Sequence, residues 1–318
     1  MILNILLLIL GFIFLIKGAD IFADGASSTA LNFKVPKMLI GLTIVAFGTS
    51  APEFAVSMSA LASGNSDMVL GNVIGSNITN ILLILSIAAI INNIKIKDNT
   101  VKKELPMALL ISVLFVVLFI DTNLKNRTIN QITRQDAIVI ILFFTVFVHY
   151  LISLALLKKD KQNDNEKPKF NLITSLILII LGIASIIIGS NLVVNNASII
   201  AKILGLNDRV ISLTIIAFGT SLPELVTTIV SSRKGELDLL LGNIIGSNIF
   251  NICVVLGVPV AIYGTLTPAS FQWLDLIMLI LSSLILYIFA KTKREITKSE
   301  GIIMTLLFII YYTLVFII

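Results

Sequence analysis

The sequence predicts an all-α membrane protein with ten transmembrane helices, arranged as two inverted five-helix repeats with broken helices at the midplane. The composition, the lengths of the apolar segments and an internal duplication lead to this prediction. Of the 318 residues, 57% are hydrophobic and 13% are charged, and the mean hydropathy is +1.04. A soluble domain has about a quarter charged residues. Soluble enzymes, nucleic-acid-binding proteins and disulfide-stabilised domains are therefore excluded.

Ten segments are long and apolar enough to cross a bilayer, which takes about 20 residues of helix. Short polar loops separate them, and strands of a membrane β-barrel would be about half as long. The predicted spans are residues 2–24, 37–63, 68–93, 105–121, 137–157, 171–199, 209–232, 238–262, 272–290 and 301–318.

Lysine and arginine predict the orientation of these spans. With the N-terminus outside, the inside loops carry 17 of these residues and the outside loops carry five. Cytoplasmic loops of membrane proteins carry an excess of positive residues. We therefore expect a multi-pass protein of the cell membrane with both termini outside, and a cytoplasmic linker at 158–170.

Two motifs recur in the chain at an offset of 171 residues. Residues 43–53, TIVAFGTSAPE, match 214–224, TIIAFGTSLPE, and residues 70–80, LGNVIGSNITN, match 241–251, LGNIIGSNIFN. Such self-similarity indicates a duplicated unit.

The duplication divides the chain into a first repeat at 1–157 and a second at 171–318, with the motifs at about 41–81 and 212–252. Each repeat has five predicted spans, an odd number, so the second copy enters the membrane with opposite polarity. Inverted repeats of this kind occur in secondary transporters, where the substrate binds near the midplane at the repeat interface. Two fused repeats make a monomer sufficient for such a site.

Each repeat places one glutamate, Glu53 or Glu224, deep inside an apolar span. A carboxylate there is costly, so we expect it to face a cation, a proton path or a buried partner. Both glutamates follow Gly-Thr-Ser-X-Pro, and proline removes a backbone donor and breaks a helix. The carbonyls freed near 46–49 and 217–220 are expected to bind a cation.

Hydroxyl and amide groups surround the two glutamates in the sequence. Ser76 and Asn80 lie four residues apart, as do Ser247 and Asn251, so each pair shares one helix face. A ligand set made only of oxygen suits hard cations such as sodium and calcium and argues against zinc and copper. The GxxxG glycines beside these stripes are expected to serve close helix packing.

Lys17 and Asp20 place two charges inside the first predicted span. They lie three residues apart and so share one helix face. We expect them to pair with each other or to reach the inner interface.

The motifs resemble the paired repeats of the sodium/calcium exchanger family, within the cation/calcium exchanger superfamily, in a compact prokaryotic-type form. The resemblance rests on GTSAPE at 48–53 and GNVIGSN at 71–77, with their copies from Gly219 and Gly242, and it covers the whole chain. It implies that Glu53 and Glu224 bind calcium and also serve sodium. It further implies contributions from Thr49 and Thr220 to both kinds of site, from Ser50, Ser221, Ser76, Ser247 and the carbonyls of Ala46 and Ala217 to flanking sodium sites, and from Asn80 and Asn251 to the centre.

One position departs from part of that family. Microbial members and potassium-dependent relatives often carry aspartate where this chain has Asn251. The centre then holds two carboxylates rather than three, which weakens the case for potassium co-transport.

The expected function is secondary antiport of sodium against calcium by alternating access, electrogenic, with three sodium ions per calcium ion. Calcium, sodium and the lipid bilayer are the expected partners, and no cofactor is implied. A proton/calcium antiporter on the same scaffold and a passive cation channel are the alternatives. An enzyme is not expected, because neither a Gly-x-Ser-x-Gly elbow nor a His-Glu-x-x-His motif is present.

Overall fold

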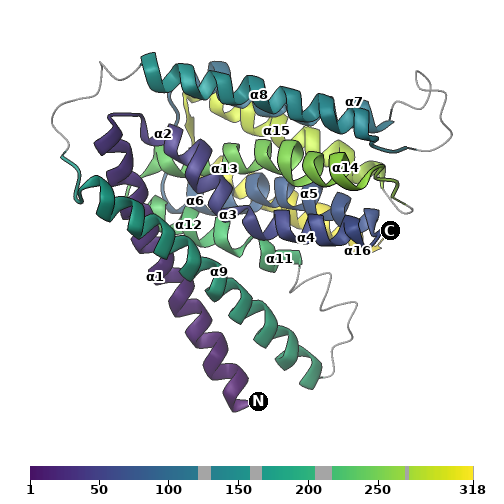
Figure 1. The fold of residues 1–318 in the computed structure, drawn as a ribbon, viewed down its shortest axis with the longest axis horizontal. Helices are drawn as coiled ribbons and strands as arrows, with labels where there is room; N and C mark the ends of the chain where they lie inside the picture. Colours follow the sequence, from purple (N-terminus) through teal and green to yellow (C-terminus); the bar gives the residue numbers. More distant parts are fainter. Residues whose placement is uncertain (121–129, 158–166, 205–216, 269–271, 318) are drawn as a thin grey trace. The chain divides into compact units, whose positions relative to one another are not determined.

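The computed structural model describes residues 1–120, 130–157, 167–204, 217–268 and 272–317 (Figure 1). These residues fold into two compact units. The first contains Met1–Pro52 and Ala155–Asn243, and the second contains Glu53–Leu154 and Ile244–Ile318. Each unit therefore combines segments from both repeats of the sequence.

Helices make up almost all of both units. The first unit contains α1 (Ile2–Phe33), α2 (Lys37–Ile40), the π-helical turn η1 (Gly41–Val45), α3 (Ala46–Thr49), α9 (Leu172–Ile203), α11 (Ala217–Thr220), α12 (Leu222–Arg233) and the beginning of α13 (Leu237–Phe250). The second contains nearly all of α4 (Ala51–Ala62) and of α8 (Arg134–Leu157), the end of α13, and α5 (Ser66–Thr79), η2 (Asn80–Leu85), α6 (Ser86–Ile91), β1 (Ile94–Lys95), η3 (Thr100–Glu104), α7 (Leu105–Ile120), η5 (Asn251–Leu256), α14 (Gly257–Tyr263), α15 (Trp273–Lys293), β2 (Glu295–Ile296) and α16 (Lys298–Ile317).

Within the described residues, eight helices are long and apolar enough to cross a membrane, or nine if the bent pair Lys37–Thr49 and Ala51–Ala62 is one span. The all-helical, multi-pass membrane prediction is confirmed to this extent. The predicted seventh span, 209–232, begins in the segment 205–216, which lies outside the described residues, and its remainder forms α11 and α12.

Several spans are longer than predicted, among them α1 and α9, because the helices continue beyond the apolar segments. Residues 2–24 and 171–199 were expected, whereas α1 and α9 each contain 32 residues. Helix α1 ends where Lys34 adopts a left-handed conformation (φ 54°), two residues before Pro36. A left-handed cap followed by proline is a common way to end a helix.

Helices α1 and α9 pack closely against each other in the first unit (Figure 1). A Cβ atom on Gly11 would lie 2.9 Å from the carbonyl oxygen of Gly189, and one on Gly18 would lie 3.1 Å from that of Gly182. As the residue number increases along α1, the number of the contacting residue on α9 decreases. The two helices therefore run antiparallel. Helices α1 and α9 are the first helices of the two sequence repeats.

Among the described residues, three hydrogen bonds join residues that are 171 apart, the offset of the sequence repeat. Ser185 Oγ donates to the Phe14 carbonyl at 2.9 Å in the first unit. In the second unit, Asn248 Nδ2 donates to the Asn77 carbonyl at 3.4 Å, and the hydroxyls of Ser112 and Ser283 lie 3.5 Å apart. Equivalent positions contact each other where a two-fold axis passes between two copies.

The second unit also contains a short strand pair that the sequence did not predict. Strands β1 and β2 are antiparallel, with Ile94 opposite Ile296 and Lys95 opposite Glu295. Two residues are too few to show the alternation of apolar and polar residues by which strands are recognised.

Candidate cation site

Both repeated motifs interrupt a helix at the same residue. Helix α3 ends at Ser50 (φ −86°, ψ 7°) and helix α12 begins after Ser221 (φ −87°, ψ 3°). This sparsely populated backbone region is common at active sites. Pro52 and Pro223 are the second residues of α4 and α12, and the helices before and after Ser50 are bent by 47°. The motifs therefore break their helices as predicted.

The prolines leave the carbonyls of Gly48 and Gly219 without their helical donors, because proline lacks the N–H four residues later. Ser190 Oγ, from α9, donates to the Gly219 carbonyl at 2.9 Å. The equivalent of Ser190 in the first repeat is Ala19, which has no hydroxyl. The two breaks thus share a backbone geometry, and only the second receives a hydroxyl from this repeat position.

The carbonyl of Ala46 is not released by the break. It accepts the backbone N–H of Ser50 at 3.0 Å, because the chain keeps this bond through the last helical turn. Thr49 Oγ1 lies 3.4 Å from the same oxygen. Ala217 is the first residue of α11 and directly follows the segment outside the described residues.

Ten of the twelve predicted site residues are buried, and Thr220 is half-buried. The side chain of Ala217 lies outside the described part. The predicted residues in the first unit are Ala46, Thr49, Ser50, Ala217, Thr220, Ser221 and Glu224. Those in the second unit are Glu53, Ser76, Asn80, Ser247 and Asn251.

Glu224 is the carboxylate of the first unit. It is fully buried in the first turn of α12, where the helix dipole favours a negative charge. Ser50 Oγ donates to Glu224 Oε1 at 3.0 Å. Glu224 Oε2 is buried and has no hydrogen-bond partner among the described residues. A buried acceptor of this kind is costly unless a ligand binds it.

Thr49 lies beside this carboxylate in a second polar chain of the first unit. Its Oγ1 donates to Asn243 Oδ1 at 3.0 Å, and Asn243 Nδ2 lies 3.3 Å from Thr227 Oγ1. Thr227 is a site residue that the sequence analysis missed. Its signal was available, because it follows Glu224 by three residues and shares its helix face.

Glu53 is the carboxylate of the second unit and is also buried, in the first turn of α4. Asn72 Nδ2, from α5, donates to the Glu53 carbonyl at 3.0 Å and to Ser57 Oγ at 2.9 Å. Asn72 therefore fixes the backbone that carries the carboxylate. Ser57 was not predicted, although it follows Glu53 by four residues and shares its helix face.

Four asparagines form a reciprocal arrangement in the second unit. Asn80 Nδ2 donates to Asn248 Oδ1 at 3.0 Å, and Asn251 Nδ2 donates to Asn77 Oδ1 at 3.3 Å. Asn80 and Asn251 are equivalent positions of the two repeats, and so are Asn77 and Asn248, so each bond is the repeat equivalent of the other. The pairing partners Asn77 and Asn248 were not predicted.

Asn80 and Asn251 occupy equivalent places in the backbone as well. They begin the π-helical turns η2 and η5, and such turns are frequent at functional sites. Their Oδ1 atoms are buried and have no hydrogen-bond partner among the residues that the structure describes. Two amide oxygens are thus available as cation ligands.

The donor chemistry of both units is carboxylate, hydroxyl, amide and carbonyl oxygen. In the described ranges, no three His, Cys, Asp or Glu side chains are grouped as a metal site. Hard cations such as sodium and calcium accept carboxylate and carbonyl oxygen as ligands. The donor set therefore fits such ions as ligands.

The close-packing role of the GxxxG glycines is seen at Gly242. A Cβ atom there would lie 2.5 Å from the Met38 carbonyl of α2 and 2.8 Å from Gly41 Cα. At Gly71, its equivalent, no described atom lies within 4 Å of such a Cβ. Packing thus accounts for Gly242.

Comparison with known proteins identifies the scaffold. The chain matches the family described as sodium/calcium exchanger protein over residues 3–153 and 174–317. It is 38% identical over 320 residues to the putative antiporter CaxA of Alkalimonas amylolytica, covering 97% of each chain. It is 34% identical over 344 residues to the sodium/calcium exchanger MaX1 of Methanosarcina acetivorans, covering 98% of each.

A solved structure leads to the same assignment. The sodium-calcium exchanger NCX_Mj, soaked with 10 mM Na⁺ and zero Ca²⁺, has a TM-score of 0.86 to this chain at 32% identity, covering 98% of both chains. The residues matched by the family include both glutamate motifs, and the relatives and the solved structure cover nearly the whole length. The chain therefore belongs to the sodium/calcium exchanger family.

Proposed function

We propose that the protein is a secondary antiporter that exchanges sodium for calcium across the membrane by alternating access. The observation that carries the proposal is the buried carboxylate of Glu224, held by Ser50 at 3.0 Å with its second oxygen lacking a hydrogen-bond partner among the described residues. Its repeat equivalent, Glu53, is buried after the same helix break. Two buried negative charges match the charge of one calcium ion.

We assign the ions to the oxygen ligands of both motifs. Glu53 and Glu224 bind calcium and serve sodium in turn. The remaining ligands are Thr49, Thr220, Ser50, Ser221, Ser76, Ser247, Asn80, Asn251 and the carbonyls of Ala46 and Ala217. Within this set, the amide oxygens of Asn80 and Asn251 are supported by their burial and by their equivalent places at η2 and η5.

We further propose that the two repeats are inverted, that both termini lie outside and that one chain suffices. The antiparallel packing of α1 on α9 supports inversion. The contacts between residues 171 apart support a two-fold relation within one chain. Lys37, Lys169 and Lys234 come from three loops predicted to lie inside. Lys169 and Lys234 both bind Asp24, and Lys37 binds Glu236, two residues after Lys234, as expected for loops on one side.

Two carboxylates flanked by hydroxyl-rich segments offer one calcium site and room for three sodium ions, and energetics support this ratio. At 100 mV, inside negative, with a tenfold inward sodium gradient, each entering sodium ion supplies about 3.7 kcal/mol, and expelling calcium against the potential costs about 4.6 kcal/mol. Two sodium ions leave about 2.8 kcal/mol, enough for roughly a hundredfold calcium gradient. Three leave about 6.5 kcal/mol, enough for between four and five decades. We therefore propose three sodium ions per calcium ion and electrogenic exchange.

Calcium uptake into proteoliposomes tests this function. Vesicles loaded with sodium and diluted into sodium-free buffer with radioactive calcium should accumulate calcium, and an imposed proton gradient without sodium should not drive uptake. Uptake driven only by the proton gradient would identify the proton/calcium antiporter instead. Calcium uptake that needs neither gradient, and that is as fast in choline-loaded vesicles as in sodium-loaded vesicles, would indicate a channel.

A further inference from the structure

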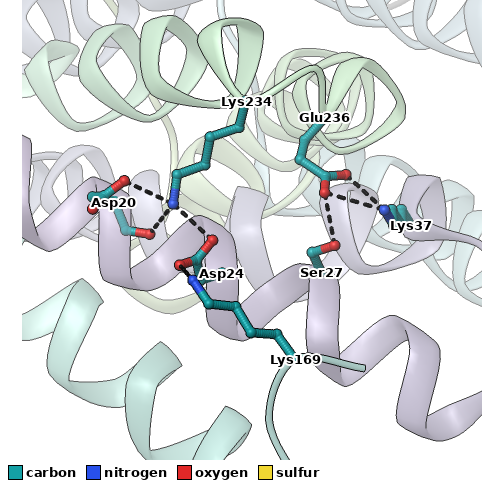
Figure 2. A network of polar contacts seen from close by, with 7 residues as sticks. All are labelled: Asp20, Asp24, Ser27, Lys37, Lys169, Lys234 and Glu236. Atoms are coloured by element: carbon teal, nitrogen blue, oxygen red, sulfur yellow. Dashed lines mark hydrogen bonds and ion pairs between the residues drawn. The ribbon is translucent and has the colours of Figure 1, made fainter. Parts of the chain in front are cut away.

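Seven residues of the first unit form two neighbouring groups of ion pairs and hydrogen bonds, one around Lys234 and one around Glu236 (Figure 2). They come from the second half of α1, the start of α2, the segment before α9 and the turn between α12 and α13. The seven are Asp20, Asp24, Ser27, Lys37, Lys169, Lys234 and Glu236. Asp20 therefore does not rely on Lys17 for its charge partner, although the sequence analysis considered that pairing.

Lys234 fastens the α12–α13 turn to α1. Its Nζ lies 2.7 Å from each of three oxygens: the Asp20 carbonyl, Asp20 Oδ1 and Asp24 Oδ1. An ammonium group has three N–H donors, so α1 supplies an acceptor for every one. Lys169 Nζ binds the other oxygen of Asp24, Oδ2, at 2.8 Å.

Glu236 fastens the same turn with the opposite charge. Its Oε2 lies 3.0 Å from Lys37 Nζ, and its Oε1 accepts from Ser27 Oγ at 2.9 Å. The side chains of Lys37, Glu236 and Lys234 are 21%, 19% and 24% exposed, respectively. Water therefore screens these pairs less than it screens fully exposed pairs.

The first repeat contains the same turn without the charges. The turn Ser63–Asn65 corresponds to Lys234–Glu236, and the middle glycines have φ 78° and 73°, respectively. Asn65 is a simple helix cap, whose side chain accepts from the Met68 N–H at 3.0 Å. One backbone turn thus carries Ser and Asn in the first repeat, and Lys and Glu in the second.

The partners on the first helix of each repeat differ in the same way. Asp20 and Asp24 correspond to Asn191 and Asn195 on α9, both uncharged. Lys37 corresponds to Asp208, which lies outside the described residues. Glu236, the partner of Lys37, corresponds to the neutral Asn65. The repeat-related positions therefore cannot form the same ion pairs.

We propose that Lys234 and Glu236 form an ionic latch that holds the inside end of α1 against the α12–α13 turn and biases the transport cycle toward the state closed at that end. This inference rests on the proposed alternating access. In an inverted-repeat transporter, one repeat moves against the other around a fixed site. A contact without a repeat-related counterpart stabilises only one of the two states, the one open to the outside or the one open to the inside. It therefore shifts the populations of these states.

Calcium–calcium exchange measured from each side tests the latch. It needs no sodium gradient, and the apparent affinity on each side is reduced by the fraction of protein open to that side. The ratio of the outside to the inside half-saturating calcium concentration therefore tracks the ratio of the two states. In Lys234→Gln and in Glu236→Gln, this ratio should rise roughly 5- to 30-fold, the range expected for losing a part-buried ion pair.

Two further variants control the experiment. Lys102→Gln removes an exposed pair with Asp98, whose side chains are 65% and 63% exposed, and should leave the ratio unchanged. Glu236→Lys should raise the ratio, and adding Lys37→Glu should restore it by reversing the pair.

The outcomes separate the latch from the proposed function. Wild-type protein that fails to exchange calcium for calcium would refute the antiport itself. Wild-type exchange with an unchanged ratio in both latch variants, or with both half-saturating concentrations rising in parallel, would overturn the latch and leave the antiport standing. Absence of rescue by the charge reversal would show that contacts other than the ion pair set the ratio, and this also counts against the latch.

Discussion

Replacing Glu224 by glutamine isolates the charge of one carboxylate while preserving its packing. The side chain is fully buried, and glutamine has nearly the same volume. Ser50 Oγ donates to Glu224 Oε1 at 3.0 Å, and the amide oxygen of glutamine accepts that bond equally. Glu224→Gln should therefore fold, and its effect should fall on ion binding.

The expected loss follows from electrostatics. Two unit charges 4 Å apart attract by about 4 kcal/mol at an effective dielectric constant of 20, so a divalent ion gains about 8 kcal/mol from one carboxylate. Relief of the buried charge in the ion-free protein offsets part of this. If half remains, calcium affinity falls by roughly three decades. Transport at micromolar calcium should then be abolished.

The assay is sodium-driven uptake of radioactive calcium into proteoliposomes, with calcium titration calorimetry on the same preparation. Glu104→Gln provides the matched control, because Glu104 is a buried carboxylate of the second unit that accepts the Tyr150 hydroxyl, outside both motifs. Glu104→Gln should retain uptake and affinity. Near-normal calcium uptake in Glu224→Gln, or equal losses in both variants, would refute the assignment of Glu224 as a ligand.

Three further predictions concern co-transport, packing and current. Because Asn251 adds no third carboxylate, exchange should proceed with choline in place of potassium on both sides, and a strict potassium requirement would contradict this assignment. Gly242→Ala places a methyl group 2.5 Å from the Met38 carbonyl, so it should destabilise the protein by about 1–3 kcal/mol and lower its melting temperature in detergent; an unchanged melting temperature would disprove the close approach. Sodium-driven calcium efflux should generate an inward current that grows as the inside becomes more negative, whereas electroneutral exchange would rule out three sodium ions per calcium ion.

Local properties of the chain were enough to predict an all-helical membrane protein, the eight or nine spans that the described residues contain, and the helix breaks. The length of an apolar segment decides whether a helix can cross a bilayer. A proline lacks a backbone donor wherever the chain folds, so the breaks at Ser50 and Ser221 could be placed from the motifs alone. The buried positions of Glu53 and Glu224 could likewise be read from the apolar residues around them.

Local properties did not reveal which carbonyls the breaks release. The sequence analysis expected free carbonyls around each break, but the Ala46 carbonyl accepts the Ser50 N–H. Whether a last helical bond survives depends on the dihedral angles of the turn. The hydroxyl of Ser190 on the Gly219 carbonyl depends on packing against α9, which no local pattern encodes.

Tertiary structure alone decided the partners of the polar side chains. Glu224 binds the hydroxyl of Ser50, which lies 174 residues earlier in the chain, and Asp20 binds Lys234, 214 residues later, although Lys17 is three residues away. A hydrogen bond or ion pair requires its atoms within about 3 Å, and only the packed helices bring such distant residues that close. The sequence therefore determined which polar groups the membrane spans would contain, and the packing of α1, α9 and α12 determined which of them meet.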